Sequence, residues 1–159
     1  MRRITFTLAV LAVAATLTAG PALASSKGTD RPLRGTSTSA TTLDLVTGTG
    51  SSVGSGEISH LGRFTFTNDI TSFTLTGNAT TISLTGTIVA ANGDEVHTTA
   101  RGTGTLDEVT LVSTVVGGTG RFADASGTLT STVTNTTLAI AGATVTATES
   151  EVHEGRVSY

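Results

Sequence analysis

Short runs in which apolar and polar residues alternate cover most of this chain, as in Thr128-Leu129-Thr130-Ser131. A period of two places every second side chain on the same face of a β-strand. Threonine and valine, which favour strands, are abundant, whereas the helix formers Leu, Glu and Lys are few. We expect strands near residues 36–46, 57–66, 70–76, 81–91, 94–105, 109–116, 126–135 and 138–152. The chain is therefore predicted to be all-β, a single antiparallel barrel of about eight strands.

The first residues have the pattern of an export signal. Arg2 and Arg3 precede an apolar stretch over 4–19, and Ala22-Leu23-Ala24 matches a cleavage site. The stretch is shorter than the roughly 20 residues of a membrane-spanning helix. We expect a signal peptide over 1–24, a flexible tail over 25–32 and one barrel domain over 33–159, with no membrane span in the mature form. The predicted location is secreted, or periplasmic in a two-membrane bacterium.

Composition restricts the possible partners of the mature chain. The net charge of −3 becomes −5 without Arg2 and Arg3, and Lys27 is the only lysine. No basic stripe is present, so nucleic acid is not an expected partner. The chain has no cysteine and no tryptophan, so the fold uses no disulfides and stacking on an aromatic platform is not expected.

A glycine-rich segment, 117–127, separates two predicted strands. Its Gly118-x-Gly120-x-x-Ala123 spacing matches the dinucleotide-binding fingerprint, but the residues that follow alternate as a strand does, not as a helix. Because a helix N-terminus is what would face the pyrophosphate, no cofactor is predicted. We expect a structural loop that the side chains of Arg121 and Phe122 pin onto the barrel. The residues of this loop are Gly117, Gly118, Gly120, Arg121, Phe122 and Gly127.

Four segments together resemble a family of small secreted bacterial β-barrels, which is itself similar to plant dirigent proteins and allene oxide cyclases. These segments are 59–64 (SHLGRF), 90–94 (AANGD), 117–127 (GGTGRFADASG) and 155–159 (GRVSY). The resemblance implies a barrel of the allene oxide cyclase or dirigent type, in which a cyclase holds its unstable substrate inside the barrel. It also implies a possible homo-oligomer. No pocket residue of those families can be matched to a position here.

The Asn92-Gly93 pair predicts a two-residue hairpin turn. That turn would pair Ile88 with His97 and place His97 and Arg101 on the more apolar face. Either this face lines the lumen, which we favour, or the turn is longer and the register shifts.

All three histidines have acidic neighbours: Glu57 near His60, Glu95 near His97, and Glu151 and Glu154 beside His153. Such strand pairs are usually solvated charge pairs, so no metal site is predicted. His60 shares a predicted strand face with Phe64 and Phe66, and we expect it to be buried or to face the lumen.

These patterns favour binding of a small hydrophobic molecule in the barrel lumen. The candidate ligand-binding residues are His60, Phe64, Phe66, Ile88, His97 and Arg101. The alternatives are a cyclase or isomerase, with His60 or His97 as the catalytic proton handler, and a purely structural secreted protein.

Overall fold

The structure is a computed structural model that describes residues 28–159, and the predicted signal peptide over 1–24 lies outside the described residues. Within that range the chain forms eight strands and one short 3₁₀ turn, η1. The elements are β1 (Asp30–Asp44), β2 (Thr49–Ile58), β3 (Gly62–Thr76), β4 (Ala79–Ala90), β5 (Glu95–Gly104), β6 (Glu108–Gly118), η1 (Gly120–Phe122), β7 (Ser126–Ala141) and β8 (Thr144–Ser158). None of the described helical turns is long and apolar enough to cross a membrane.

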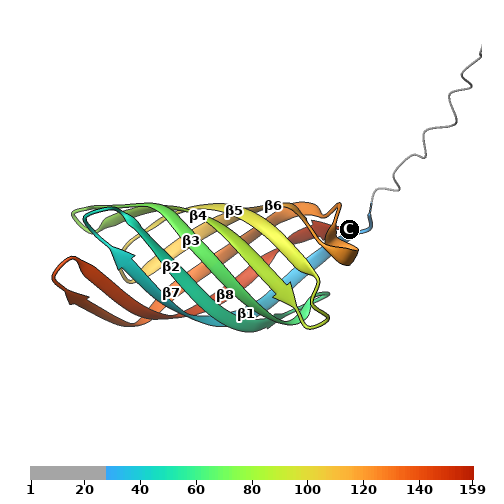
Figure 1. Cartoon of the computed structure of the whole chain (residues 1–159), viewed down its shortest axis with the longest axis horizontal. Helices are drawn as coiled ribbons and strands as arrows, with labels where there is room; N and C mark the ends of the chain where they lie inside the picture. The colour runs from blue at the N-terminus through green and yellow to red at the C-terminus, as the bar shows by residue number, and fades with distance from the viewer. Residues whose placement is uncertain (1–27) are drawn as a thin grey trace, which may run out of the picture.

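Every strand pairs antiparallel with its neighbour in the chain, and β8 pairs back onto β1. This closing ladder runs from Asp30 opposite Ser158 to Asp44 opposite Thr144. The prediction of an all-β, closed antiparallel barrel of eight strands is confirmed (Figure 1). Closure fixes which side chains of each strand face the lumen, since successive side chains point to opposite faces.

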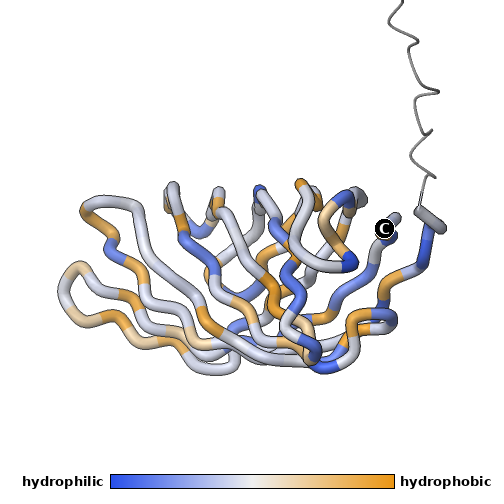
Figure 2. Tube along the Cα trace, turned by 45° about the vertical axis from the view of Figure 1, so that its right-hand side comes forward, coloured by the Kyte–Doolittle hydropathy of each residue, from blue (hydrophilic) through white to orange (hydrophobic). Residues whose placement is uncertain are grey.

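Two clusters of buried apolar side chains fill the barrel interior, and Figure 2 shows apolar positions interspersed with polar ones along the strands. The larger cluster lies toward the end of the barrel that carries the C-terminus. It comprises Leu33, Ile58, Leu61, Phe64, Phe66, Ala90, Val96, Val115, Phe122, Ala125, Leu129 and Val157. The smaller cluster lies toward the other end and comprises Leu43, Ile70, Leu84, Ala100 and Val145.

The β6–β7 connection caps the end near the C-terminus (Figure 1). Phe122 is 0% exposed and meets the Tyr159 ring edge-on, with 4.7 Å between the ring centroids. The Arg121 guanidinium stacks 4.5 Å from the Phe122 ring centroid, and its Nη2 donates to the His60 carbonyl oxygen at 3.3 Å. These contacts of Arg121 and Phe122 hold the loop against the end of the barrel. A three-residue 3₁₀ turn, rather than the helix of a dinucleotide site, follows the glycines.

Several predicted strand limits are wrong. Residues 49–56, expected to be a turn, belong to β2, and the chain reverses instead at 59–61, inside a predicted strand. β3 continues through 68–69, and a turn at 142–143 divides the predicted strand over 138–152. β1 begins at Asp30, so residues 30–32 are paired strand rather than tail. The glycine and serine cluster over 49–56 is strand here because it pairs with β1 on one side and β3 on the other.

The favoured register of the β4–β5 hairpin is also wrong. The loop spans four residues, closed by the Ala90 N–H donating to the Asp94 carbonyl oxygen at 2.9 Å, and Gly93 adopts a φ of 86°. Ile88 therefore lies opposite Val96, and His97 lies opposite Thr87. A shift of one residue moves every β5 side chain to the opposite face, so the alternative of a longer turn holds.

Replacement of Phe122 by alanine is expected to lower the free energy of unfolding by about 3–5 kcal/mol, because the ring is fully buried. Urea unfolding monitored by circular dichroism measures the change. Val116→Ala is the matched control, since Val116 is 58% exposed on neighbouring β6 and its truncation should cost about 0.5 kcal/mol or less. Equal effects of the two substitutions would contradict a capping role for Phe122.

Candidate functional site

Three of the predicted ligand-binding residues face the lumen. Phe64 and Phe66 are each 6% exposed, with 6.1 Å between their ring centroids, and Ile88 packs against the same cluster. All three line one internal cavity. Their placement follows from the β3–β4 register, in which Phe66 lies opposite Ile88.

His60 does not face the lumen. It lies in the turn between β2 and β3, where its φ of 68° is in the left-handed region, and its side chain is exposed. Its carbonyl oxygen, rather than its imidazole, has a structural contact, since it accepts the bond from Arg121. The expectation of a buried or lumenal His60 is wrong because the strand predicted over 57–66 contains this turn.

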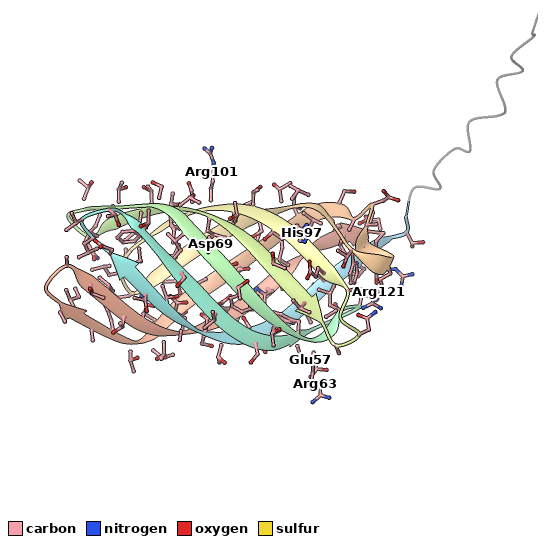
Figure 3. All side chains as sticks on the ribbon, viewed as in Figure 1. Glu57, Arg63, Asp69, His97, Arg101 and Arg121 are labelled. Atoms are coloured by element: carbon pink, nitrogen blue, oxygen red, sulfur yellow. The ribbon has the colours of Figure 1, made fainter. Side chains whose placement is uncertain are left out.

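His97 and Arg101 lie on the outer wall. The His97 Nε2 is 3.0 Å from a Glu95 carboxylate oxygen, and the His97 side chain is 44% exposed. Arg101 points away from the barrel (Figure 3). Both positions follow from the one-residue change in the β4–β5 register, so the expectation that they reach the lumen is wrong.

The lumen contains two cavities along its length. The capped-end chamber, of about 60 Å³, is lined mainly by the larger apolar cluster. The far-end chamber, of about 80 Å³, is lined by the smaller cluster except Ala100, together with Phe73, Ile82 and Val133. Asn68, Leu111 and Glu151 line both chambers and mark the boundary between them.

A polar patch crosses the inner wall on three adjacent strands, β7, β8 and β1. Successive inward positions of β8 carry Glu149, Glu151 and His153, because residues two apart share a face of the strand. Hydroxyl and amide side chains flank them on both sides. We call this set the inner polar patch: Ser37, Ser39 and Thr41 of β1, Ser131 and Asn135 of β7, and Glu149, Glu151 and His153 of β8.

Two carboxyl groups share the Ser39 hydroxyl. Its Oγ is 2.5 Å from a Glu149 oxygen and 2.7 Å from a Glu151 oxygen. A hydroxyl carries one hydrogen, so both contacts are hydrogen bonds only when one carboxyl is protonated. Burial raises the pKa of Glu151, and the neighbouring Glu149 carboxylate raises it further. Below its raised pKa, Glu151 therefore holds the proton and donates to Ser39, while Ser39 donates to Glu149.

His153 is held between two serines. Its Nε2 lies 2.8 Å from the Ser37 Oγ and its Nδ1 lies 2.7 Å from the Ser131 Oγ. Burial lowers the pKa of His153 to about 4, so the neutral imidazole donates to one serine and accepts from the other. The Glu151 Oε2 is 3.7 Å from the His153 Nε2, beyond hydrogen-bond distance.

From the sequence, the pair of Glu151 and His153 has no preference over the other two acid–histidine pairs, Glu57 with His60 and Glu95 with His97. The signal that distinguishes it is a second inward acid, Glu149, two residues before Glu151. Hydroxyl residues at 37, 39, 41 and 131 also occupy alternate positions of strands. Recognising them as partners requires the β1–β8 closure, which joins the two ends of the chain.

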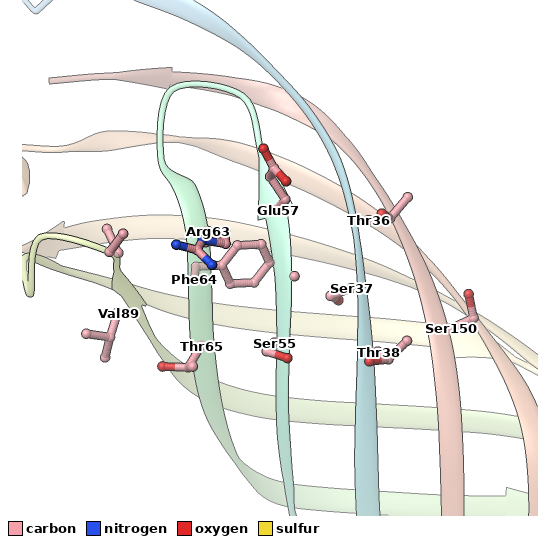
Figure 4. Close-up of a pocket in the computed structure, with 13 residues that line it drawn as sticks. Thr36, Ser37, Thr38, Ser55, Glu57, Arg63, Phe64, Thr65, Val89 and Ser150 are labelled. Carbon is pink, nitrogen blue, oxygen red and sulfur yellow. The ribbon is translucent and has the colours of Figure 1, made fainter.

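A larger hollow lies on the outer wall, over β1 to β4 and one residue of β8 (Figure 4). Its volume is about 850 Å³, but it is an open depression, and about half of the residues that line it are serines and threonines. Glu57 and Arg63 face each other there in register, and both point away from the barrel (Figure 3). It contains no apolar enclosure and none of the buried ionisable groups, so the lumen is the better candidate site.

Between Gly28 and Tyr159, no group of three or more His, Cys, Asp or Glu side chains is placed to hold a metal ion.

Comparison of the chain with protein-family models, curated proteins and solved structures finds no match. The resemblance to dirigent proteins and allene oxide cyclases therefore stays a prediction.

The pKa shifts predict how stability depends on pH. Below about pH 6.5 the unfolded chain protonates His153 while the folded chain keeps it neutral down to about pH 4, so this histidine lowers stability as the pH falls across that window. The loss approaches about 3 kcal/mol. Glu151 has the opposite effect. From about pH 4.5 upward, its carboxyl ionises in the unfolded chain but stays protonated in the folded chain, so stability falls as the pH rises toward the raised pKa of Glu151.

Urea unfolding between about pH 4 and 8 separates the two effects. His153→Gln should remove the loss on the acid side, and Glu151→Gln should remove the loss on the other side. Glu154→Gln is the control on the same strand, because the Glu154 side chain is 69% exposed. If both lumenal variants keep the pH profile of the unsubstituted protein, the two side chains are not buried in these protonation states.

Proposed function

We propose that the barrel binds a small, mainly apolar molecule in its lumen and orients it with the inner polar patch. One observation carries the proposal: the two chambers meet at Asn68 and Glu151, so an apolar interior has polar groups at its middle. Binding sites for small molecules combine apolar walls with a few polar groups of this kind.

The volumes limit the size of the molecule. Chambers of about 60 and 80 Å³ are well below the roughly 300–1,000 Å³ typical of sites for drug-sized ligands. A molecule of a few non-hydrogen atoms fits either chamber. Gly86 contributes to this shape, because the Asn68 Oδ1 occupies the space that a β-carbon at position 86 would need. The Asn68 amide is thereby placed against the wall of β4, beside the boundary of the chambers.

The arrangement supports binding over covalent catalysis. Ser37 and His153 have the spacing of a nucleophile and its base, but the other imidazole nitrogen meets Ser131 rather than a carboxylate. The neighbouring strands use their backbone N–H groups in the barrel ladder, so no pair of them is available to stabilise an oxyanion. A cyclase or isomerase activity, the alternative from the sequence, would have to use Glu151 and His153 instead of His60 and His97. A purely structural barrel would leave both chambers without a ligand.

Xenon tests the proposal whatever the natural ligand is, because it enters apolar cavities of this size. Methyl NMR spectra under xenon pressure should show shifts of Ile70, Leu84 and Val145, which surround the far-end chamber. Ala147→Leu fills that chamber and should abolish the shifts. Val152→Leu, on the outer face of the same strand, should retain them.

Native mass spectrometry of protein purified from its producing culture complements the NMR experiment. A bound small molecule that Ala147→Leu displaces and Val152→Leu retains would support the proposal. A barrel whose lumenal methyl groups do not respond to xenon, and with which nothing co-purifies, would contradict it. The fold of Ala147→Leu is checked by circular dichroism, since overpacking a core costs about 1–3 kcal/mol.

A further inference from the structure

The far-end chamber contains acidic groups and no basic group among the described residues. Glu149 and Glu151 both line it. The described arginines lie elsewhere: Arg31 is beside Tyr159 at the capped end, and Arg34, Arg63, Arg101, Arg121 and Arg156 are exposed. Burying an ionised carboxylate without a counter-charge is costly, and here the cost is reduced only by the proton on Glu151 and by hydroxyl donors.

Polar atoms around this chamber include three oxygens that can still accept a hydrogen bond. The Asn135 Oδ1 is buried without a partner, while its Nδ2 donates to the Leu106 carbonyl oxygen. Both bonds to Glu149, from Ser39 and Thr41, end on Oε2 and leave Oε1 free among the described residues. The Glu151 side chain is only 9% exposed, and its Oε2 lies beyond hydrogen-bond distance of His153.

These oxygens belong to one neighbourhood. Asn135 lies directly opposite Glu149 in the β7–β8 ladder, and Glu151 is the next inward residue of β8. Cross-strand partners on one face have β-carbons about 5 Å apart. The chamber therefore presents several acceptors, two of them on carboxyl groups, to whatever occupies it, and the matching ligand group is a multiple donor with a positive charge.

We propose that the far-end chamber binds a small organic cation, a primary alkylammonium, with its nitrogen against Glu149, Glu151 and Asn135 and its alkyl chain against Ile70, Leu84 and Val145. The inference rests on the proposed function and adds the class of the ligand. An ammonium group has three N–H donors and no acceptor, which matches three acceptor oxygens. A metal cation is the less suitable occupant, since the described residues offer no cluster that could hold one.

When the ligand binds, the positive charge of its ammonium group replaces the proton of Glu151. In the unliganded barrel below the raised pKa of Glu151, Ser39 bridges Glu149 and a protonated Glu151. When the ammonium arrives, the Glu151 proton leaves to solvent and the two carboxylates share the ligand charge. The other groups that face Glu151 are Ser37, Ser39 and Thr41 of β1, Ser131 and Asn135 of β7, and His153 and Glu149 of β8. Of these only His153 and Glu149 are titratable, and burial keeps His153 neutral down to about pH 4.

Isothermal titration calorimetry with n-butylamine, 1-butanol and butyrate tests the ligand class. The three probes share one alkyl chain and differ in charge. We expect butylamine to bind at least about tenfold more tightly than butanol and butyrate not to bind, in line with the strength of charge-assisted hydrogen bonds. Below the raised pKa of Glu151, titration in two buffers of different ionisation enthalpy should show release of up to one proton per bound amine, and the affinity should rise with pH.

Variants locate the site. Glu149→Gln and Glu151→Gln should reduce butylamine binding to the level of butanol and leave butanol binding unchanged, whereas Glu154→Gln on the outer face should change neither. Asn135→Ala removes the third acceptor and should weaken amine binding severalfold while butanol binding stays. The comparison of probes on the unsubstituted protein remains decisive even if a glutamine variant does not fold.

The outcomes separate this inference from the proposed function. Equal affinity for butylamine and butanol overturns the cation inference and leaves lumenal binding standing. Failure of both probes, together with lumenal methyl groups that do not respond to xenon, overturns both. Tight amine binding that survives Glu149→Gln and Glu151→Gln places the cation elsewhere and also overturns the inference.

Discussion

Closure of the β8–β1 ladder is the constraint on which the candidate site depends. Once β8 is paired on both sides, its inward positions are fixed, and Glu149, Glu151 and His153 must all lie inside. Three polar side chains inside a barrel of this size are tolerated only when partners satisfy them. The serines of β1 and β7 supply those partners, since they occupy the inward positions on either side of β8.

The same closure explains why the two ends of the barrel differ. At the capped end, Phe122 and Tyr159 fill the interior and Arg121 ties the β6–β7 connection to the β2–β3 turn. Toward the other end the apolar cluster is smaller, and the cavity beside it reaches both glutamates of the patch. The capped end is thus closed by aromatic packing, whereas the chamber at the other end has both glutamates in its wall. The proposal that the far-end chamber binds a ligand rests on this difference.

Sequence alone predicted the fold class because alternation is a local signal, and it identified Phe64, Phe66 and Ile88 as lumenal for the same reason. It also anticipated that Arg121 and Phe122 fix the glycine-rich loop.

It misplaced His97 and Arg101 because the length of one turn decides the face of a whole strand, and Asn92-Gly93 occurs here within a four-residue loop. His60 was misplaced because a turn at 59–61 interrupts an apparently continuous strand. The inner polar patch could not be predicted, since its β1 serines lie more than 100 residues from Glu151 and His153 and meet them only through barrel closure.

The central claim is that Glu151 lies inside the closed barrel and holds a proton shared through Ser39. Carbon-detected NMR titration of the glutamate side-chain carboxyl groups tests it most directly. The account predicts one carboxyl resonance, assigned to Glu151 by its loss in Glu151→Gln, with a pKa clearly above 4.5 and dependent on Ser39. A Glu151 resonance that titrates together with those of exposed glutamates, and does not respond to Ser39→Ala, would contradict it.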